Sequence, residues 1–320
     1  MRISIGGGGT DLPSFYSKYK SYFISGAIDK YIYIMVQERK YYDEYLLKYS
    51  KVETVKDVAK IKNEIIRECL KFLKINNPLE IVSFSDIGGE TGLGSSGAFC
   101  VGLLNALHTY KKEVVNQGQI AEEACYIAMK ILSFPSGKQD EYITAYGGLT
   151  SFNINKKGDV SVNPNEFDQD FTRELEHYLY MFYTGIRRKS KEILQIQKEA
   201  TEKRQTSIIN NLRETQQLGY EIKDALKKED AFRFGQLLDK HWKLKRKRSK
   251  TTSEKIDKWY KIARKSGAVG GKIMGAGGGG FFLFYCDKNA PQMIRTLQKN
   301  GLTHIPFNFD HQGTKIIANL

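Results

Sequence analysis

The chain has 320 residues, 41% of them hydrophobic and 27% charged, which is typical of one long or two ordinary folded domains. Its cysteines form no Cys-x-x-Cys pair, which argues against a zinc site or a disulfide framework. No apolar run is long enough to span a bilayer, and residues 1–6 do not resemble a signal peptide. These features predict a cytoplasmic protein that does not cross a membrane.

The 50 Lys and Arg against 36 Asp and Glu give a net charge of +14. Part of this excess is local, because residues 241–250 hold six Lys or Arg and no acid. One interpretation is a nucleic-acid surface, and the other is a solvated helix face near an anionic substrate. No aromatic residues interleave with the charges as a stacking surface would require, so we expect the second.

The first half of the chain alternates strand and helix patterns. A β-rich segment covers residues 27–36, and apolar residues three or four apart predict an amphipathic helix over 55–73. A strand at 80–84 comes before helices at 98–110 and 120–132. Gly147 and Gly148 begin a hairpin with its turn at 155–158.

The composition shifts near residue 165, so we predict domains at 1–165 and 166–320. The second half begins with a strand at 178–183 and a long polar helix over 189–228, which Gly219 would interrupt. A helix at 256–265, a strand at 281–285, a helix at 291–299 and a final strand at 315–318 complete it.

One glycine-rich loop carries the clearest chemical signal: Gly92, Leu93, Gly94, Ser95, Ser96, Gly97 and Ala98. It follows a predicted strand and opens an apolar helix. Glycines let the backbone approach an anion closely, and the free amides of a helix N-terminus favour negative charge. The two hydroxyls add donors or a metal ligand. Loop 92–98 is therefore predicted to bind a polyphosphate such as a nucleotide.

Other nucleotide motifs fit less well. Gly92-x-Gly94-x-x-Gly97 matches the dinucleotide fingerprint, but the acid about 20 residues on, Glu113, does not end a strand. The chain has no Walker Gly-Lys-Ser/Thr and no protein-kinase His-Arg-Asp or Asp-Phe-Gly. A tight turn without a ligand remains as the structural alternative.

Three motifs in order resemble those of the GHMP small-molecule kinases: residues 2–11, 85–98 and 270–282. The resemblance covers nearly the whole chain. It implies an α+β protein of two domains, with an S5-like N-terminal domain and a ferredoxin-like C-terminal domain. It also implies ATP and Mg²⁺ as cofactors, while the oligomeric state, a homodimer included, stays open.

Residues 135–142, 145–148, 183–188 and 307–317 further resemble the heptose-phosphate kinases of that family. That similarity implies phosphoryl transfer to the anomeric hydroxyl of D-glycero-D-manno-heptose 7-phosphate. The product would be the 1,7-bisphosphate, a precursor of nucleotide-activated heptose for surface polysaccharide. Two alternatives remain: a kinase for a galactose- or fucose-like sugar, and a binding protein without turnover.

The resemblance assigns roles to individual residues. Asp140 matches the catalytic base, with Arg2 and Lys138 as candidate partners, and Ser96 matches a metal ligand. Guanidinium groups suit phosphate. The implied substrate-binding residues are Gly8, Gly9, Thr10, Asp11, Arg187, Arg188, Gly277 and Gly278, with Lys272 as a weaker candidate.

Three departures from the family pattern stand out. The position of the second metal ligand, a glutamate, is Ala128 here, and Glu122 and Glu123 face other directions on a helix. Gly88 replaces a common proline, which should loosen the approach to loop 92–98. The first motif begins at residue 2, so the first strand is expected to be short.

Overall fold

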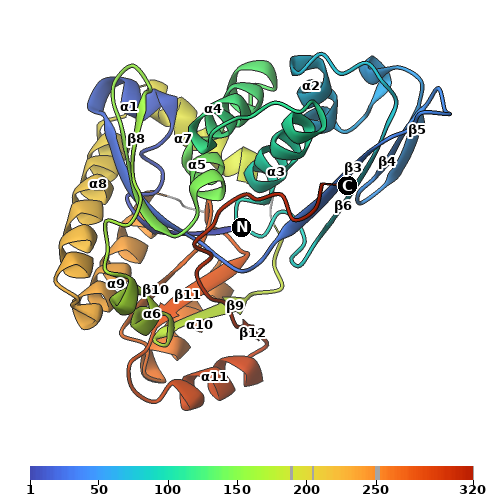
Figure 1. Cartoon of the computed structure of the whole chain (residues 1–320). Coiled ribbons are helices and arrows are strands. Elements are labelled where there is room, and N and C mark those ends of the chain that lie inside the picture. Colours follow the sequence, from blue (N-terminus) through green and yellow to red (C-terminus); the bar gives the residue numbers. More distant parts are fainter. Residues whose placement is uncertain (188–189, 204, 249–252, 320) are drawn as a thin grey trace.

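The computed structural model describes residues 1–187, 190–203, 205–248 and 253–319, and in these ranges the strands form three four-stranded sheets (Figure 1). The first sheet has the order β1-β2-β7-β8 and is antiparallel throughout. Its strands are β1 Arg2–Gly6, β2 Ser21–Ala27, β7 Leu149–Ile154 and β8 Val160–Asn163.

The second sheet has the order β3-β6-β4-β5, and β4 runs parallel to β6. It consists of β3 Ile32–Glu38, β6 Leu79–Ser85, β4 Tyr45–Lys48 and β5 Val52–Val55. The third sheet, antiparallel and in the order β10-β11-β9-β12, is built from the second half of the chain. It consists of β10 Gly270–Ile273, β11 Phe281–Tyr285, β9 Leu179–Tyr183 and β12 Thr303–Ile305.

Helices cover these sheets. In the first half they are α1 Pro13–Tyr19, the short η1 Val58–Lys60, α2 Glu64–Phe72, α3 Ser95–Tyr110, α4 Gln117–Tyr126, its π-helical continuation η2 Ile127–Ile131, and α5 Gln139–Tyr146. In the second half they are α6 Gln169–Glu176, α7 Ser190–Glu202, α8 Thr206–Lys227, α9 Ala231–Arg248, α10 Glu254–Lys265 and α11 Ala290–Lys299.

The apolar interior divides into three clusters. One packs α2, α3 and α4 against the first two sheets, and another packs α10 and α11 against the third sheet. The central cluster joins Ile3 and Ile5 of β1 to Leu218 and Ile222 of α8, so it draws on both halves of the chain. The predicted boundary at residue 165 stays a prediction, although the first two sheets end before it and the third begins after it.

The helix expected over 55–73 begins only at Glu64. The Asn63 side chain accepts the Ile66 amide at 3.1 Å, which fixes the helix start. Upstream, Glu53 in β5 accepts the amides of Lys62 and Asn63 at 2.7 and 3.1 Å. These side-chain bonds to the backbone override the apolar periodicity, which alone predicts a longer helix.

Three other expectations need correction. Residues 27–36 belong to two strands, because β2 ends at Ala27 and β3 begins at Ile32. The long helix breaks between α7 and α8 and continues through Gly219. There α8 approaches the chain so closely that a methyl group on Gly219 would lie 3.2 Å from the Gly7 amide nitrogen. Residues 315–318 form no strand.

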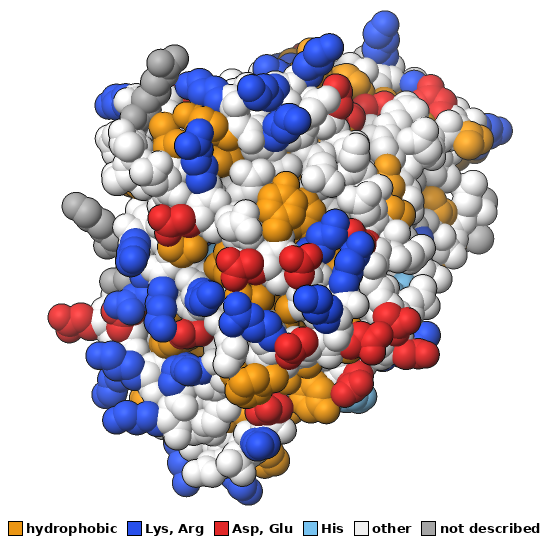
Figure 2. All heavy atoms as spheres, turned by 90° about the vertical axis from the view of Figure 1, so that its left-hand side faces the viewer, with side chains coloured by type: hydrophobic (Ala, Val, Ile, Leu, Met, Phe, Trp, Pro, Cys, Tyr) orange, Lys and Arg blue, Asp and Glu red, His pale blue; other side chains and the backbone are white. Residues whose placement is uncertain are grey.

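Figure 2 shows the face that α8 occupies. Lys and Arg side chains lie there among Asp and Glu side chains and orange apolar ones. The basic residues of this face therefore form a mixed surface in that view.

Candidate active site

Loop 92–98 presents a helix N-terminus, as expected. Gly92 and Gly94 have φ angles of 83° and 73°, in the left-handed region that favours glycine, and α3 starts directly after Gly94. The first intrahelical hydrogen bond runs from the Ala98 amide to the Gly94 carbonyl at 2.9 Å. The amides of Ser95, Ser96 and Gly97 precede it and have no acceptor within the helix. This arrangement suits an anion.

Strand β1 and loop 275–280 hold this loop in place. The Arg2 amide donates to the Leu93 carbonyl at 3.0 Å, and the Leu93 side chain is buried in the core. From the other side, a methyl group on Gly275 would lie only 2.6 Å from the Gly92 Cα. Only glycine allows this backbone-to-backbone contact, which joins the second and third motifs.

Asp140 lies in the first turn of α5, against the start of α3. A methyl group on Gly97 would lie 2.7 Å from the Asp140 Cβ, so the two helix N-termini converge. Arg2 donates to Asp140 Oδ1 through Nε at 2.7 Å and through Nη2 at 2.6 Å, while its Nη1 donates to the Gly92 carbonyl at 2.6 Å. The Arg2 side chain is buried, whereas that of Asp140 is 33% exposed and thus open to a ligand.

Asp11 is buried beside this pair. Its Oδ1 accepts the Gly9 amide and its Oδ2 accepts the Gln139 amide, both at 3.1 Å. Burial raises the pKa of the Asp11 carboxyl, with a further contribution from the charge of Asp140. A methyl group on Gly137 would collide with Asp11 Oδ2, so glycine is required there for Asp11 to occupy its position.

The other residues of loop 6–11 shape its backbone. The buried Thr10 hydroxyl donates to the Gly7 carbonyl at 2.8 Å and lies 2.6 Å from the Ser21 hydroxyl. Gly8 packs on Ser4, whose hydroxyl would lie 2.5 Å from a methyl group added at Gly8. These contacts give Thr10 and Gly8 a structural task, and their contact with a sugar remains a prediction.

Lys138 points away from the Asp140 carboxylate. Its ammonium group forms an ion pair with Glu122 Oε1 at 2.5 Å and donates to the Gly158 carbonyl at 2.9 Å. Tyr142 also donates to Glu122. Because Lys138 and Asp140 are only two residues apart in the chain, their side chains were expected to lie close together. Because α5 starts between them, however, their side chains leave in different directions.

Of the two candidate arginines, Arg188 lies outside the described residues. Arg187 is exposed, and its Nη2 lies 3.0 Å from the position that a Gly88 side chain would take. The glycine at position 88 therefore leaves room for the Arg187 guanidinium beside loop 92–98. Gly277 and Gly278 lie in loop 275–280 with φ angles of 97° and 88°.

The described residues contain no group of three or more His, Cys, Asp or Glu that could hold a metal ion. Ala128 is buried in the π-helical turn. Glu122 is bound to Lys138, and Glu123 Oε2 lies 2.7 Å from His108 Nε2. The Ser96 hydroxyl is exposed and the Asp140 carboxylate is partly exposed, so both present oxygen atoms to a ligand.

Several residues of the site were not predicted. Gln139 contacts Asp11, Gln197 Nε2 donates to the Gly9 carbonyl at 2.9 Å, and the Arg248 guanidinium lies beside Gly9. Glu141 is buried next to Asp140, and its Oε2 has no hydrogen-bond partner among the described residues. Burial and the neighbouring Asp140 raise the Glu141 pKa to about 8. For Arg248, the one available signal in the sequence was its helical spacing, which places it on the same face as the buried residues of α9.

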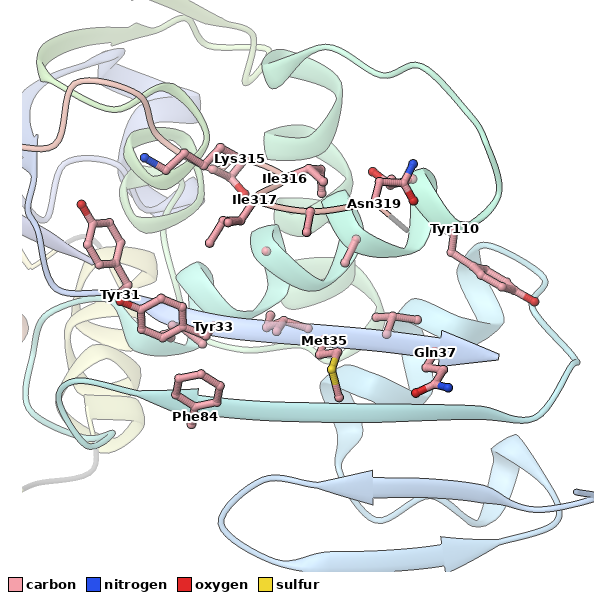
Figure 3. A pocket seen from close by; sticks show the side chains of 18 of the residues that line it. Tyr31, Tyr33, Met35, Gln37, Phe84, Tyr110, Lys315, Ile316, Ile317 and Asn319 are labelled. Carbon is pink, nitrogen blue, oxygen red and sulfur yellow. The ribbon is translucent and has the colours of Figure 1, made fainter. Parts of the chain in front are cut away.

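A separate groove of about 1620 Å³ lies between β3, α3 and the C-terminal segment (Figure 3). Tyr33, Met35 and Phe84 line its floor. Lys315 and Ile317 of the expected final strand line its other side instead of joining a sheet. The groove also reaches Ala98, the first residue of α3 to donate an intrahelical bond.

Two family models match the chain. The model of the GHMP kinases N terminal domain matches residues 54–148, and the model described as GHMP kinases C terminal matches residues 222–302. Together with the three-motif site, these matches show that the chain belongs to the GHMP kinase family. The expected α+β fold of that family is confirmed.

The similarity to individual relatives extends over almost the whole length of the chain. A D-glycero-alpha-D-manno-heptose 7-phosphate kinase of Campylobacter jejuni is 27% identical, covering 98% of this chain and 96% of its own. A D-glycero-D-manno-heptose 1-phosphate kinase structure from Bacteroides thetaiotaomicron superposes with a TM-score of 0.80 at 20% identity, covering 99% and 98%. A putative sugar kinase structure from Campylobacter jejuni gives 0.74 at 25% identity, covering 98% and 94%.

Within the family, the protein is an ATP-dependent sugar kinase. In the part of the chain that the structure describes, no helix combines the length and the apolarity needed to cross a membrane.

Proposed function

We propose that the protein transfers the γ-phosphoryl group of ATP to the anomeric hydroxyl of D-glycero-D-manno-heptose 7-phosphate, giving the 1,7-bisphosphate for nucleotide-heptose and surface polysaccharide synthesis. The end-to-end similarity to the Campylobacter heptose 7-phosphate kinase supports this substrate. The geometry of Asp140 carries the proposal: a partly exposed carboxylate in the first turn of α5, fixed through one oxygen by Arg2 and lying against the start of α3. A cytoplasmic location and a homodimer remain predictions.

In this proposal, the amides at the start of α3 bind the phosphates of ATP, and Asp140 accepts the proton of the sugar hydroxyl. Arg2 occupies Oδ1, so Oδ2 is the oxygen that would take the proton. The hydroxyl oxygen forms a bond to the γ-phosphorus while the bond to the bridging oxygen breaks, and ADP leaves with that electron pair. Phosphoryl transfer requires positioning and charge stabilisation more than covalent chemistry. The fixed Arg2 and the N-terminus of α3 would supply this positioning and stabilisation.

The donor set fits Mg²⁺ that arrives on the nucleotide. Mg²⁺ prefers oxygen ligands and usually keeps several waters, with one or two carboxylates and substrate phosphates. Ser96 would hold it from the protein side. When bound, the ion neutralises charge on the β- and γ-phosphates. Because Ala128 supplies no carboxylate, the protein would contribute fewer ligands than the family pattern does.

A panel of acceptors tests the substrate. ADP release would be measured with Mg-ATP and heptose 7-phosphate, heptose 1-phosphate, galactose or fucose. We expect kcat/KM for heptose 7-phosphate to exceed the others by at least 100-fold. A preference for heptose 1-phosphate, the acceptor in the name of the Bacteroides structure, would move the transfer to the other end of the sugar. A preference for galactose or fucose would refute the proposed substrate.

A further inference from the structure

Helix α9 turns a row of basic side chains toward the protein interior. His241, Lys245 and Arg248 are spaced four and three residues apart, so they lie on one face of the helix. That face continues the apolar stripe of Phe234 and Leu238. The basic run, residues 241–250, is therefore only in part the solvated surface that its composition suggests.

Two exposed members of the run, Lys243 and Arg246, have acidic partners. Lys243 pairs with Asp239 at 2.7 Å and Arg246 pairs with Asp257 at 2.6 Å, whereas Lys247 is exposed. The run thus separates into a surface half and a buried half. Two of the surface cations, Lys243 and Arg246, are therefore neutralised by acids of the same chain.

The buried half is joined by Lys272 of β10. Lys272 donates to the Ile5 carbonyl at 3.0 Å, just before loop 6–11, and lies 2.6 Å from His241 Nδ1. Lys245 donates to the carbonyls of Ile273, at 2.8 Å, and Gly275. Each lysine thus binds the backbone at the start of one glycine loop of the active site.

This cluster brings basic side chains together, and Lys245 and Lys272 among them are buried. Burial lowers the pKa of Lys245 and of Lys272 well below their usual values, and the neighbouring cations lower them further. Burial also lowers the pKa of Arg248 to about 10, and the one carboxylate that opposes this effect is Asp11. Buried charges are costly unless they are paired, so an anion bound nearby would favour the charged forms of these groups.

Arg248 is the member of the cluster that lies against loop 6–11. Its Nη1 donates to Asn211 Oδ1 and to Thr215 Oγ1, both at 3.2 Å, which fixes the plane of the guanidinium. Its Nη2 would lie 3.1 Å from a methyl group added at Gly9. Arg248 as a whole residue is only partly buried, on the side of the helix that faces loop 6–11.

Contacts along loop 6–11 connect Arg248 to the reacting end of the site. Gly9 lies against Arg248, and its amide donates to Asp11 Oδ1. Asp11 Oδ2 in turn accepts the amide of Gln139, the neighbour of Asp140. A sugar bound along this loop would have Asp140 at one end and Arg248 at the other.

We propose that Arg248 binds the phosphate group of the acceptor sugar, and so selects phosphorylated over unphosphorylated acceptors. This inference rests on the proposed function, since it assumes that the acceptor carries a phosphate. Guanidinium groups bind phosphate through two parallel hydrogen bonds. Placing the phosphate there directs the anomeric hydroxyl toward Asp140.

The test compares Arg248→Gln and Arg248→Lys with Lys247→Ala, which removes an exposed charge from the same helix. For Arg248→Gln we expect the KM for heptose 7-phosphate to rise at least 30-fold, the KM for ATP to change less than threefold, and kcat/KM for unphosphorylated heptose to fall much less than that for heptose 7-phosphate. Arg248→Lys should restore part of the affinity, and Lys247→Ala should behave as wild type. Equal losses on both acceptors, or an unchanged KM, would overturn the role of Arg248.

A second measurement does not depend on the identity of the sugar. Melting temperatures would be compared in inorganic phosphate and in chloride at equal ionic strength. Phosphate should stabilise the wild type and Lys247→Ala more than Arg248→Gln, and equal stabilisation of all three would overturn the anion site. If heptose 7-phosphate is not turned over but phosphate stabilises through Arg248, the proposed substrate fails while the site stands.

Discussion

The charges at the reacting centre are arranged around one buried arginine. Arg2 binds Asp140 through two nitrogens and the Gly92 carbonyl through the third, so a single side chain aligns the proposed base with loop 92–98. Such a fixed cation stabilises charge that develops in a transition state without having to reorganise. Removing the carboxylate charge should therefore affect the chemical step first.

For Asp140→Asn we expect kcat to fall by about 10²- to 10⁴-fold, the range for loss of a general base, because the amide cannot accept the proton. Asparagine has the same shape as aspartate, so the circular dichroism spectrum and the KM for ATP should stay close to wild type. Asp170→Asn, at an exposed site on α6, is the control. A kcat within threefold of wild type would remove Asp140 from the role of base.

Glu141 gives a prediction about pH. Its pKa is raised from 4.5 to about 8, first by burial and then by Asp140, so between these values the folded protein keeps a proton that the unfolded chain releases. Stability from this group is full below pH 4.5 and is lost as the pH rises toward 8. Glu141→Gln stays neutral throughout and should gain stability relative to wild type over that range.

Melting temperatures of wild type, Glu141→Gln and the exposed Glu202→Gln at pH 5 and pH 8 would measure this effect. We expect the difference between Glu141→Gln and wild type to grow by several degrees from pH 5 to pH 8, and that for Glu202→Gln to stay constant. A difference that shrinks with pH would contradict a protonated Glu141.

At the scale of elements, the site depends on close approaches that only glycine permits. Gly137 leaves space for Asp11, and Gly97 and Gly94 let α3 meet α5 at Asp140. For Gly137→Ala we expect displacement of Asp11, with the KM for the sugar raised at least tenfold and the KM for ATP changed much less. Ser136→Ala is the adjacent control, because the buried Ser136 hydroxyl has no hydrogen-bond partner among the described residues.

Crystal structures of both variants would show whether Asp11 has moved. An Asp11 carboxylate that still binds the Gln139 amide in Gly137→Ala, together with an unchanged KM for the sugar, would contradict this account of the loop.

The differences between sequence pattern and elements have local causes. Periodicity placed a helix over 55–73, but the carboxylate of Glu53 and the cap at Asn63 delay its start. Gly219 suggested a helix break, yet its missing side chain lets α8 touch the backbone of Gly7. Both effects involve residues brought together by folding, which a local pattern cannot contain.

At the scale of the whole molecule, the order of three glycine motifs was enough to predict the family and the α+β fold. The family resemblance also gave Arg2 as a candidate partner of Asp140, and the two side chains form hydrogen bonds although they are 138 residues apart in the chain. The directions of individual side chains were harder to predict from the sequence. The sequence alone did not show that Lys138 turns to Glu122 or that Arg248 turns inward, because both depend on how helices pack.

The most direct test of the proposed reaction is phosphorus NMR of the protein with Mg-ATP and D-glycero-D-manno-heptose 7-phosphate. We predict that the ATP signals decrease, that ADP appears, and that one equivalent of a new phosphate signal arises with coupling to the anomeric proton, while the 7-phosphate signal persists. ADP formed without an anomeric phosphate, or no reaction with a protein that ATP stabilises, would contradict transfer to this hydroxyl.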